Sequence, residues 1–342
     1  MMKRIRFDCY EGKEYFAYEL ETAYLKATIL EYGGIIQRLE EKQSGIDIVQ
    51  GYETIETYLK DQDTYSGAVI GRYCNRIGNG NFVLNGMVYP LYQNNGKNTL
   101  HGGKFGFNQK IFASKIENDT LVLSYISLDG EEGFPGELHL EVRYCLHDNS
   151  LDFAYKVHTD ADTVFNITNH TYFNLRGYGS IMEHQFRINA SRFGLINETG
   201  LTTDDTADVE QTPFDFRTGK SLNEALSQDH EQIALANGID HHFLIDGAGS
   251  REFLTCDCDK LKLLVESDLP GFHFYTGNFL LSYEGKKGIK YDKRTGFCIE
   301  TQFYPDNINN KQTPKSILKA GEIQSFHTKY TVINKEIHDE NN

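Results

Sequence analysis

The sequence lacks tryptophan altogether and contains only 6 prolines, 6 cysteines and 4 methionines among its 342 residues. Six cysteines are too few to build a disulfide-based fold of this length. Basic residues are also scarce, because 34 Lys and Arg stand against 49 Asp and Glu and the net charge is −15. A nucleic-acid or anionic-membrane surface needs basic patches. We therefore expect no nucleic-acid partner and no membrane partner.

Long hydrophobic runs are missing as well. None approaches the roughly 20 apolar residues that cross a bilayer as a helix. The segment from Met1 to Asp8 contains Lys and Arg, but no apolar stretch follows it, so it does not have the pattern of a signal peptide. These observations predict a cytoplasmic protein.

Linkers and repeats are also absent. The sequence has no Pro- or Ser-rich linker, no low-complexity tract and no repeat with a period of about 20–50 residues. The length alone is compatible with one large domain or with two ordinary ones. Without a linker, we predict a single domain over residues 1–342, with a polar tail at 335–342 that frays.

Aromatic residues are plentiful despite the missing tryptophan, because Tyr and Phe make up 13% of the chain. Short β-rich runs alternate with turn pairs such as Asn95-Gly96 and Asp129-Gly130. Helical patterns are few: Glu53 to Leu59, and Leu222 to Ala236, which closes at Asn237-Gly238. We therefore predict an all-β fold, a large antiparallel β-sandwich with a few short helices. The predicted strands include 16–20, 25–29, 82–84, 121–126, 138–146, 151–157, 261–266 and 330–333.

Two stretches have one polar and one apolar face when they are interpreted as β-strands. In Asn166 to Leu175, the polar face carries His170 and Tyr172 among amides and hydroxyls. In Phe297 to Pro305, Glu300 lies on the polar face, and the opposite face is aromatic and aliphatic. A carboxylate in such a strand needs either solvent or a partner. If the two polar faces line one pocket, His170 and Glu300 form an acid/base pair.

Four further stretches place polar side chains beside glycines or aromatics: Gly71 to Ile77, Asn98 to Gly103, Gly238 to Phe243, and Gly271 to Asn278. The glycines that follow His101 let the backbone bend sharply. His273 lies on a strand face of its own stretch. These polar residues also have purely structural explanations. Arg76 can pair with one of many acidic side chains, and Asp240 can cap a turn.

Other kinds of site have less support. The sequence has no Gly-rich phosphate loop and no G-x-S-x-G nucleophile elbow. Glycoside hydrolysis would need a second carboxylate near Glu300, such as Asp240. Two sets of potential metal ligands lack a recognised spacing: Asp240, His241, His242 and His170, and the pair Cys256 and Cys258. We expect no metal at either set, and we expect the other cysteines, Cys9, Cys74, Cys145 and Cys298, to be buried thiols or spectators.

Five motifs follow one another along the chain: Gly71-Arg72-Tyr73-Cys74-Asn75-Arg76-Ile77, Asn98 to Gly103, Asn169-His170-Thr171-Tyr172-Phe173-Asn174-Leu175, Gly238-Ile239-Asp240-His241, and Glu300-Thr301-Gln302. In order and approximate spacing they resemble those of aldose 1-epimerases, the galactose mutarotases. The resemblance runs from about Thr22 to Thr331. It implies the galactose mutarotase-like supersandwich, without cofactor or metal. It also implies interconversion of the α and β anomers of hexoses such as galactose and glucose.

The resemblance also implies roles for individual residues. Glu300 matches the general base of the family, and His170 matches its general acid. Four residues match substrate-binding positions: Asn75, Arg76, His101 and Asp240.

Two residues depart from the family pattern. His273 stands where many members have glutamine, which bears on the contacts to the ring hydroxyls and on the pH profile. Phe112 stands where many members have tryptophan, and this change concerns packing. Both departures leave the sugar preference open.

Mutarotation needs two coordinated proton transfers, because the C1 hydroxyl loses a proton while the ring oxygen gains one. A glutamate with a pKa near 4.3 is ionised at neutral pH and can be the base. A histidine with a pKa near 6.5 can be protonated and serve as the acid, more so if neighbouring carboxylates raise its pKa. Each positioned transfer contributes on the order of 10²–10⁴-fold. An aromatic side chain such as Tyr172 can cover an apolar sugar face.

Three alternatives stay open at this point. The first is a relative that acts on another aldose or on a hexose 6-phosphate; a phosphate-specific site needs several basic side chains, and only Arg72 and Arg76 are candidates. A non-catalytic carbohydrate-binding module needs the hydroxyl contacts but no acid/base pair. A metal-dependent hydrolase is the third. We expect a small-molecule sugar as the substrate and a monomer or a homodimer as the assembly.

Overall fold

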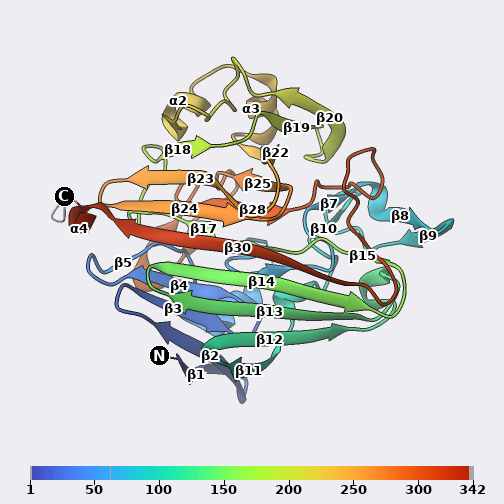
Figure 1. Ribbon diagram of the computed structural model, residues 1–342, viewed down its shortest axis with the longest axis horizontal. Helices are drawn as coiled ribbons and strands as arrows, with labels where there is room; N and C mark the ends of the chain where they lie inside the picture. Colours follow the sequence, from blue (N-terminus) through green and yellow to red (C-terminus); the bar gives the residue numbers. More distant parts are fainter. Residues whose placement is uncertain (1, 62, 339–342) are drawn as a thin grey trace.

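Three antiparallel sheets of nine, six and five strands make up most of the molecule, and short two-stranded pairs join them (Figure 1). The computed structural model describes residues 2–61 and 63–338. The α-helices in this part of the chain are short: α1 Ile55–Lys60, α2 Leu222–Leu226, α3 Glu231–Ala236 and α4 Lys335–His338. No helix among the described residues is long and apolar enough to cross a membrane. The predicted all-β fold with a few short helices is confirmed.

The five-stranded sheet is a meander formed by the N-terminal part of the chain. Its strands pair in the order in which they occur in the sequence. Between the first two strands, Glu11 and Gly12 have φ angles of 49° and 77°, the geometry of a type I′ hairpin turn. The strands are β1 Met2–Tyr10, β2 Lys13–Glu21, β3 Leu25–Leu30, β4 Ile36–Glu41 and β5 Ile46–Asp47.

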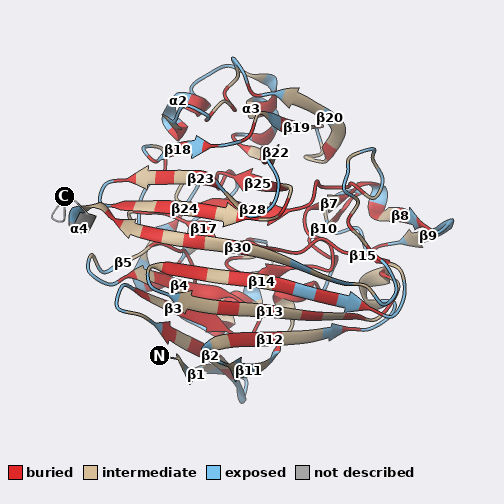
Figure 2. Ribbon diagram, in the orientation of Figure 1, coloured by how far each residue is buried: buried red, intermediate tan, exposed pale blue. Residues whose placement is uncertain are grey.

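The nine-stranded sheet runs across the middle of the molecule in Figure 1. Alternate residues of its strands point into the core, as the two-residue period of a strand requires. In β13, Leu138, Leu140, Val142 and Tyr144 are buried and the residues between them are partly exposed (Figure 2). Its strands, in spatial order, are β11 Ala113–Glu117, β12 Thr120–Ser127, β13 Leu138–His147, β14 Ser150–Thr159, β30 Ile323–Asn334, β24 Leu261–Ser267, β23 Arg251–Cys258, β18 Gln185–Ile188 and β21 Lys220–Ser221.

The six-stranded sheet differs because its central strands β25 and β28 are buried on both faces. Phe272, Phe274 and Ile299 belong to one face and join the hydrophobic core. The opposite face carries the polar side chains of these strands. In spatial order the strands are β17 Tyr172–Phe173, β28 Phe297–Gln302, β25 Gly271–Tyr275, β22 Asp240–Leu244, β19 Arg192–Ile196 and β20 Thr202–Asp208.

One cluster of buried apolar side chains extends from Tyr18 to Val332 and includes residues of all three large sheets. Phe112 belongs to it, is buried, and packs its ring 5.7 Å from that of Tyr125. Because a domain has its own hydrophobic core, we propose that the chain folds as one domain. In the tail that was expected to fray, residues 335–338 form α4, and residues 339–342 lie outside the described residues.

The prediction of one continuous strand over residues 166–175 is wrong. β16 (Thr168–Asn169) pairs with β6 (Val69–Ile70), whereas β17 (Tyr172–Phe173) pairs with β28. His170 lies between the two short strands. The chain therefore passes from one sheet to another at His170, and this change of partner interrupts the alternation of faces.

The predicted helix over residues 222–236 is instead two helices. Ser221 and Glu224 form a capping box at the start of α2. His230, with an extended φ of −155°, caps α3 by accepting from the N–H of Gln232. Because His230 caps a new helix with extended backbone, one helix cannot continue through it. The end of α3 lies where it was predicted, with Asn237 in the left-handed conformation at φ 54°.

Short strand pairs bring distant sequence motifs together. β7 (Arg76–Ile77) pairs with β10 (Thr99–Leu100), so the motif at 71–77 lies beside the loop that contains His101. The pairing of β6 with β16 places that same motif close to His170. The other pairs are β8 Asn81–Leu84 with β9 Met87–Pro90, β15 Thr163–Val164 with β29 Ile317–Leu318, and β26 Tyr283–Glu284 with β27 Lys290–Tyr291.

Arg72 is a buried cation that ties three segments together. Its guanidinium donates to the carbonyl oxygens of Pro135 (2.8 Å) and Gly136 (2.7 Å). It also donates to the carbonyl of Ser127 (2.9 Å) and to that of Leu128 (3.2 Å). Both terminal nitrogens of the side chain are therefore used by the fold, whereas its Nε has no hydrogen-bond partner among the described residues.

We expect Arg72→Met to lower the free energy of unfolding by about 3–5 kcal/mol, because it leaves buried carbonyl groups without donors. Urea denaturation followed by circular dichroism measures the change. The matched control is Arg192→Met, which breaks an exposed ion pair with Asp208 and should cost under about 1 kcal/mol. Equal losses in the two variants would contradict a structural role for Arg72.

Candidate active site

Strand register gathers one group of polar side chains on a single face of the six-stranded sheet. Glu300 of β28 lies directly opposite His273 of β25, and Cys298 lies opposite Tyr275. Tyr275 in turn lies opposite Asp240 of β22. Directly opposed residues of antiparallel strands share a face. The side chains of these five residues therefore project to the same side.

The structure brings His170 and Glu300 together, although 130 positions separate their numbers along the chain. Nε2 of His170 lies 3.7 Å from Oε1 of Glu300, and the side chains are only 6% and 2% exposed. Among the described residues, Oε2 of Glu300 has no hydrogen-bond partner. A free carboxylate oxygen beside an imidazole can accept a proton from a bound ligand.

His101 is the second imidazole of the site. Its ring centre lies 5.3 Å from that of His170, and the two rings meet edge to face. Nδ1 of His101 accepts from the main-chain N–H of Asn75 at 3.3 Å, which fixes the ring. Tyr65 covers both imidazoles, with its ring centre 4.6 Å from that of His101 and 5.9 Å from that of His170.

Asn75 and Arg76 lie at the edge of this group. Asn75 has a φ of 59°, and its Oδ1 accepts from the main-chain N–H of Arg76 at 2.8 Å. Nε of Arg76 donates to Oδ1 of Asn95 at 3.0 Å. The charge of Arg76 lowers the pKa values of both Asp240 and Glu300. Arg76 is therefore close enough to stabilise negative charge in the site.

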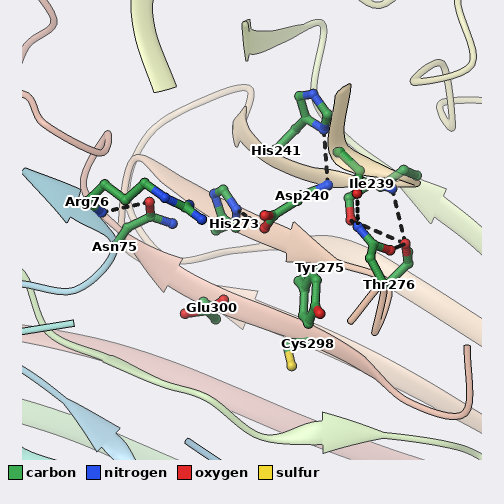
Figure 3. A network of polar contacts seen from close by, with 12 residues as sticks. Asn75, Arg76, Ile239, Asp240, His241, His273, Tyr275, Thr276, Cys298 and Glu300 are labelled. Atoms are coloured by element: carbon green, nitrogen blue, oxygen red, sulfur yellow. Dashed lines mark hydrogen bonds and ion pairs between the residues drawn. The ribbon is translucent and has the colours of Figure 1, made fainter. Parts of the chain in front are cut away.

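Asp240 and His273 form an ion pair in which Nε2 of His273 lies 2.8 Å from Oδ1 of Asp240. Figure 3 shows the two side chains pointing toward each other above the strand that carries Glu300. Burial by itself raises the pKa of Asp240, but the hydrogen bond and charge of His273, together with Arg76, lower it to about 2. Asp240 is thus an ionised hydrogen-bond acceptor at neutral pH.

Burial pushes the pKa values of the central pair in opposite directions. It lowers the pKa of His170 to about 4. It raises the pKa of Glu300 well above its usual range, and the charge of Asp240 adds to this effect. The sequence left open whether neighbouring carboxylates raise the pKa of His170, and in the structure desolvation outweighs the charge of Asp240. The opposite shifts of the pair favour a proton on Glu300 over one on His170.

Sequence patterns did not indicate three further residues of the site. Tyr65 lies in an irregular segment with a φ of 55°, and no motif marks it. Tyr275 shares a face with His273, as the strand period predicts, but that pattern gave it no role in the site. Cys298 was expected to have no role, yet its Sγ lies 3.5 Å from Nδ1 of His170. Tyr172, which was expected near the site, has its ring centre 5.2 Å from that of His170.

Neither set of potential metal ligands forms a cluster of three or more ligands among the described residues. His241 points to the opposite side of its strand from Asp240, where it contacts Gln232 at 3.1 Å (Figure 3). Cys256 and Cys258 are buried in the hydrophobic core. Among the described residues, one other group has metal-ligand geometry: one ligand atom from each of His101, His170 and Glu300 lies within 4.8 Å of the others. These are the groups of the acid/base site itself.

A buried carboxylate beside two imidazoles, with ionised and amide hydrogen-bonding groups around it, is the site of an acid/base enzyme for a polar small molecule. Comparisons with known proteins define it further. The profile of the family described as Aldose 1-epimerase matches residues 17–331. The chain is 38% identical to a galactose mutarotase from Bos taurus over 318 residues, which are 89% of this chain and 90% of the relative.

Two further comparisons indicate the same family. An aldose 1-epimerase from Escherichia coli strain K12 is 32% identical over 323 residues, which are 91% of this chain and 93% of the relative. The crystal structure of a galactose 1-epimerase from Lactobacillus acidophilus NCFM superposes with a TM-score of 0.87 at 26% identity, covering 98% of this chain and 99% of that chain. The chain belongs to the aldose 1-epimerase family.

We expect Gly102→Ala to lower kcat/KM by at least about 10²-fold, because a Cβ at Gly102 would lie 2.0 Å from the carbonyl oxygen of Gly71 and would displace His101. Polarimetry of a freshly dissolved pure anomer of galactose measures the activity. The control is Gly86→Ala, where φ is also positive at 78° but a Cβ meets nothing within 4 Å. Wild-type activity in Gly102→Ala would show that the position of the His101 loop does not matter.

Proposed function

We propose that the protein interconverts the α and β anomers of free aldohexoses such as galactose and glucose, with Glu300 as the base and His170 as the acid. This is an aldose 1-epimerase activity, which is an isomerase activity, and it agrees with the family to which the chain belongs. The single observation that supports the residue roles is the buried contact of 3.7 Å between His170 and Glu300. Two such groups can reach the two oxygens of one hemiacetal.

The reaction needs only proton movements. Glu300 removes the proton of the C1 hydroxyl, the C1–O5 bond breaks, and its electrons go to O5. His170 then donates its proton to O5, which leaves a free aldehyde at C1. Rotation about C1–C2 and the reverse transfers close the ring as the other anomer. Each atom and proton is returned, so no oxidant or reductant is required.

The reactive state has Glu300 ionised and His170 protonated, whereas the pKa shifts of the pair favour the proton on Glu300. Binding of a sugar supplies hydroxyl donors to the carboxylate, and Arg76 already lowers its pKa. Both effects favour transfer of the proton to His170. The reactive state is therefore reached by one proton transfer within the pair.

The surrounding residues are proposed to hold the sugar. Asp240 is an ionised acceptor for hydroxyl groups, and Arg76 and Asn75 offer donors. His101 and His273 offer ring nitrogens from two sides. Tyr172 is proposed to cover an apolar sugar face, since its buried ring lies beside His170.

A hexose 6-phosphate is less favoured as the substrate. Of the two basic candidates, Arg72 donates to main-chain carbonyl groups of the fold, so only Arg76 remains to contact a phosphate. A purely carbohydrate-binding module is also less favoured, because binding sugar hydroxyls does not require a buried carboxylate with a raised pKa beside an imidazole. We further propose a cytoplasmic location and a monomer or homodimer, as the sequence indicates.

We expect Glu300→Gln to abolish mutarotation above the spontaneous rate and His170→Asn to lower kcat by at least about 10²-fold, since each removes one positioned proton transfer. Polarimetry of fresh α-D-galactose measures both. Glu210→Gln and His158→Asn change exposed residues and should leave the rate unchanged. A fully active Glu300→Gln variant would remove Glu300 as the base.

We expect kcat/KM to fall as the pH rises through the pKa of Glu300, which burial and Asp240 raise above its usual range. Glu300 and His170 share one proton in the reacting pair, and loss of that proton stops turnover. Asp240→Asn should therefore move this alkaline limb to lower pH, and Arg76→Gln should move it to higher pH. Normalised pH–rate profiles test the signs, and shifts in the same direction would contradict the assignment to Glu300.

A further inference from the structure

Cys298 lies against the imidazole of the acid/base site. It occupies β28 two positions before Glu300, so the two side chains share a face of the strand. Its Sγ lies 3.5 Å from Nδ1 of His170. The side chain is fully buried. No step of the proposed reaction uses this thiol, so the contact needs its own explanation.

The two nitrogens of His170 have different surroundings. Nε2 faces Oε1 of Glu300 at 3.7 Å, and Nδ1 faces the sulfur of Cys298. The imidazole also interacts with its own main-chain carbonyl group, which favours a proton on the ring. A sulfur lone pair and a carbonyl oxygen are both acceptors. A sulfur that accepts at Nδ1 favours a proton on that nitrogen.

The thiol of Cys298 keeps its own proton. Burial raises its pKa well above the usual range, and the charges of Glu300 and Asp240 raise it further. Tyr172 acts in the opposite direction and lowers this pKa through a side-chain interaction, and strand register places Tyr172 directly opposite Cys298. The neutral thiol keeps lone pairs on its sulfur, and these can accept from Nδ1.

We propose that Cys298 is a positioning residue for the acid/base pair. Its sulfur accepts the hydrogen bond from Nδ1–H of His170, so that Nε2 is the nitrogen that gains and loses the catalytic proton. This inference rests on the proposed function and deepens it. A proton shuttle needs Nε2 bare in the neutral ring and protonated in the cation, while Nδ1–H stays in place throughout.

Sulfur suits this role because it is a weak acceptor. A carboxylate at the same place would favour the imidazolium and would make His170 a poorer proton donor. The thiol holds the ring in orientation without that effect. It therefore fixes the tautomer of His170, while the desolvated surroundings set the pKa of its imidazole.

The first test measures the tautomer directly. In the wild-type protein labelled with ¹⁵N-histidine, we expect long-range ¹H–¹⁵N spectra near neutral pH to show His170 with Nδ1 protonated and Nε2 bare. The signal is assigned by its absence in His170→Asn. In Cys298→Ala we expect a mixture of both tautomers. Wild-type spectra with the proton on Nε2 would overturn the proposal, because the thiol would then donate to a bare Nδ1.

The second test separates positioning from packing. We expect Cys298→Ala to lower kcat by about 10- to 100-fold with KM unchanged, the scale on which a misplaced catalytic group lowers turnover. Cys298→Ser, which keeps an acceptor, should restore most of kcat. The control is Cys256→Ala, which truncates a fully buried thiol in the apolar core. Equal kcat values for Cys298→Ala and Cys256→Ala would overturn the proposal.

The pH profile of Cys298→Ser adds a readout that packing does not move. A hydroxyl accepts more strongly than a thiol, so the limb that reports His170 should move to higher pH. The titratable groups that also face His170 are unchanged in this variant: Glu300, Asp240, His273, His101, Tyr65, Tyr172 and Tyr275. An unmoved limb would count against the contact.

Failure of this inference and failure of the proposed function give different results. If Cys298 has no positioning role, Cys298→Ala turns over like Cys256→Ala while Glu300→Gln remains inactive. If the protein does not catalyse mutarotation, the wild-type protein shows no rate above the spontaneous one. The ¹⁵N spectra still report the tautomer of His170 in that case.

Discussion

The burial of Glu300 in the middle of the six-stranded sheet is the constraint on which the rest of the site depends. Its side chain is 2% exposed, and one carboxylate oxygen lacks a protein partner among the described residues. Such burial costs free energy unless the group is neutralised or paired. The extensive apolar core behind the sheet offsets this cost. The fold thereby maintains a carboxyl group that takes up and releases a proton at an unusually high pH.

The side chains around Glu300 come from two kinds of backbone. His273, Cys298 and Asp240 stand on paired strands, where register fixes their spacing. Tyr65 and His101 come from irregular segments with φ angles of 55° and 52°. Non-glycine residues rarely adopt this conformation, and they persist where the surrounding structure holds them. The site therefore combines side chains on paired strands with side chains on loops whose backbone is held in uncommon conformations.

Neighbouring charges of opposite sign shift the pKa values of the two carboxyl groups, Glu300 and Asp240. Asp240 raises the pKa of Glu300 and Arg76 lowers it. His273 and Arg76 together keep Asp240 ionised. Two carboxyl groups in one site thus have different protonation states, which lets one hold hydroxyl groups while the other transfers protons. His273, which stands where many members of the family have glutamine, takes part in this division through its ion pair with Asp240.

The sequence by itself determined the fold class and the family motifs, because strand periodicity and motif order are local properties of the chain, and it nominated His170 and Glu300 as a pair. The tertiary structure decided that residues 166–175 change sheets at His170, since the choice of strand partner depends on distant segments. It also decided the protonation of the pair, because desolvation depends on everything packed around a group. Tyr65 and Cys298 joined the site for the same reason: no local pattern encodes which buried side chain will meet an imidazole.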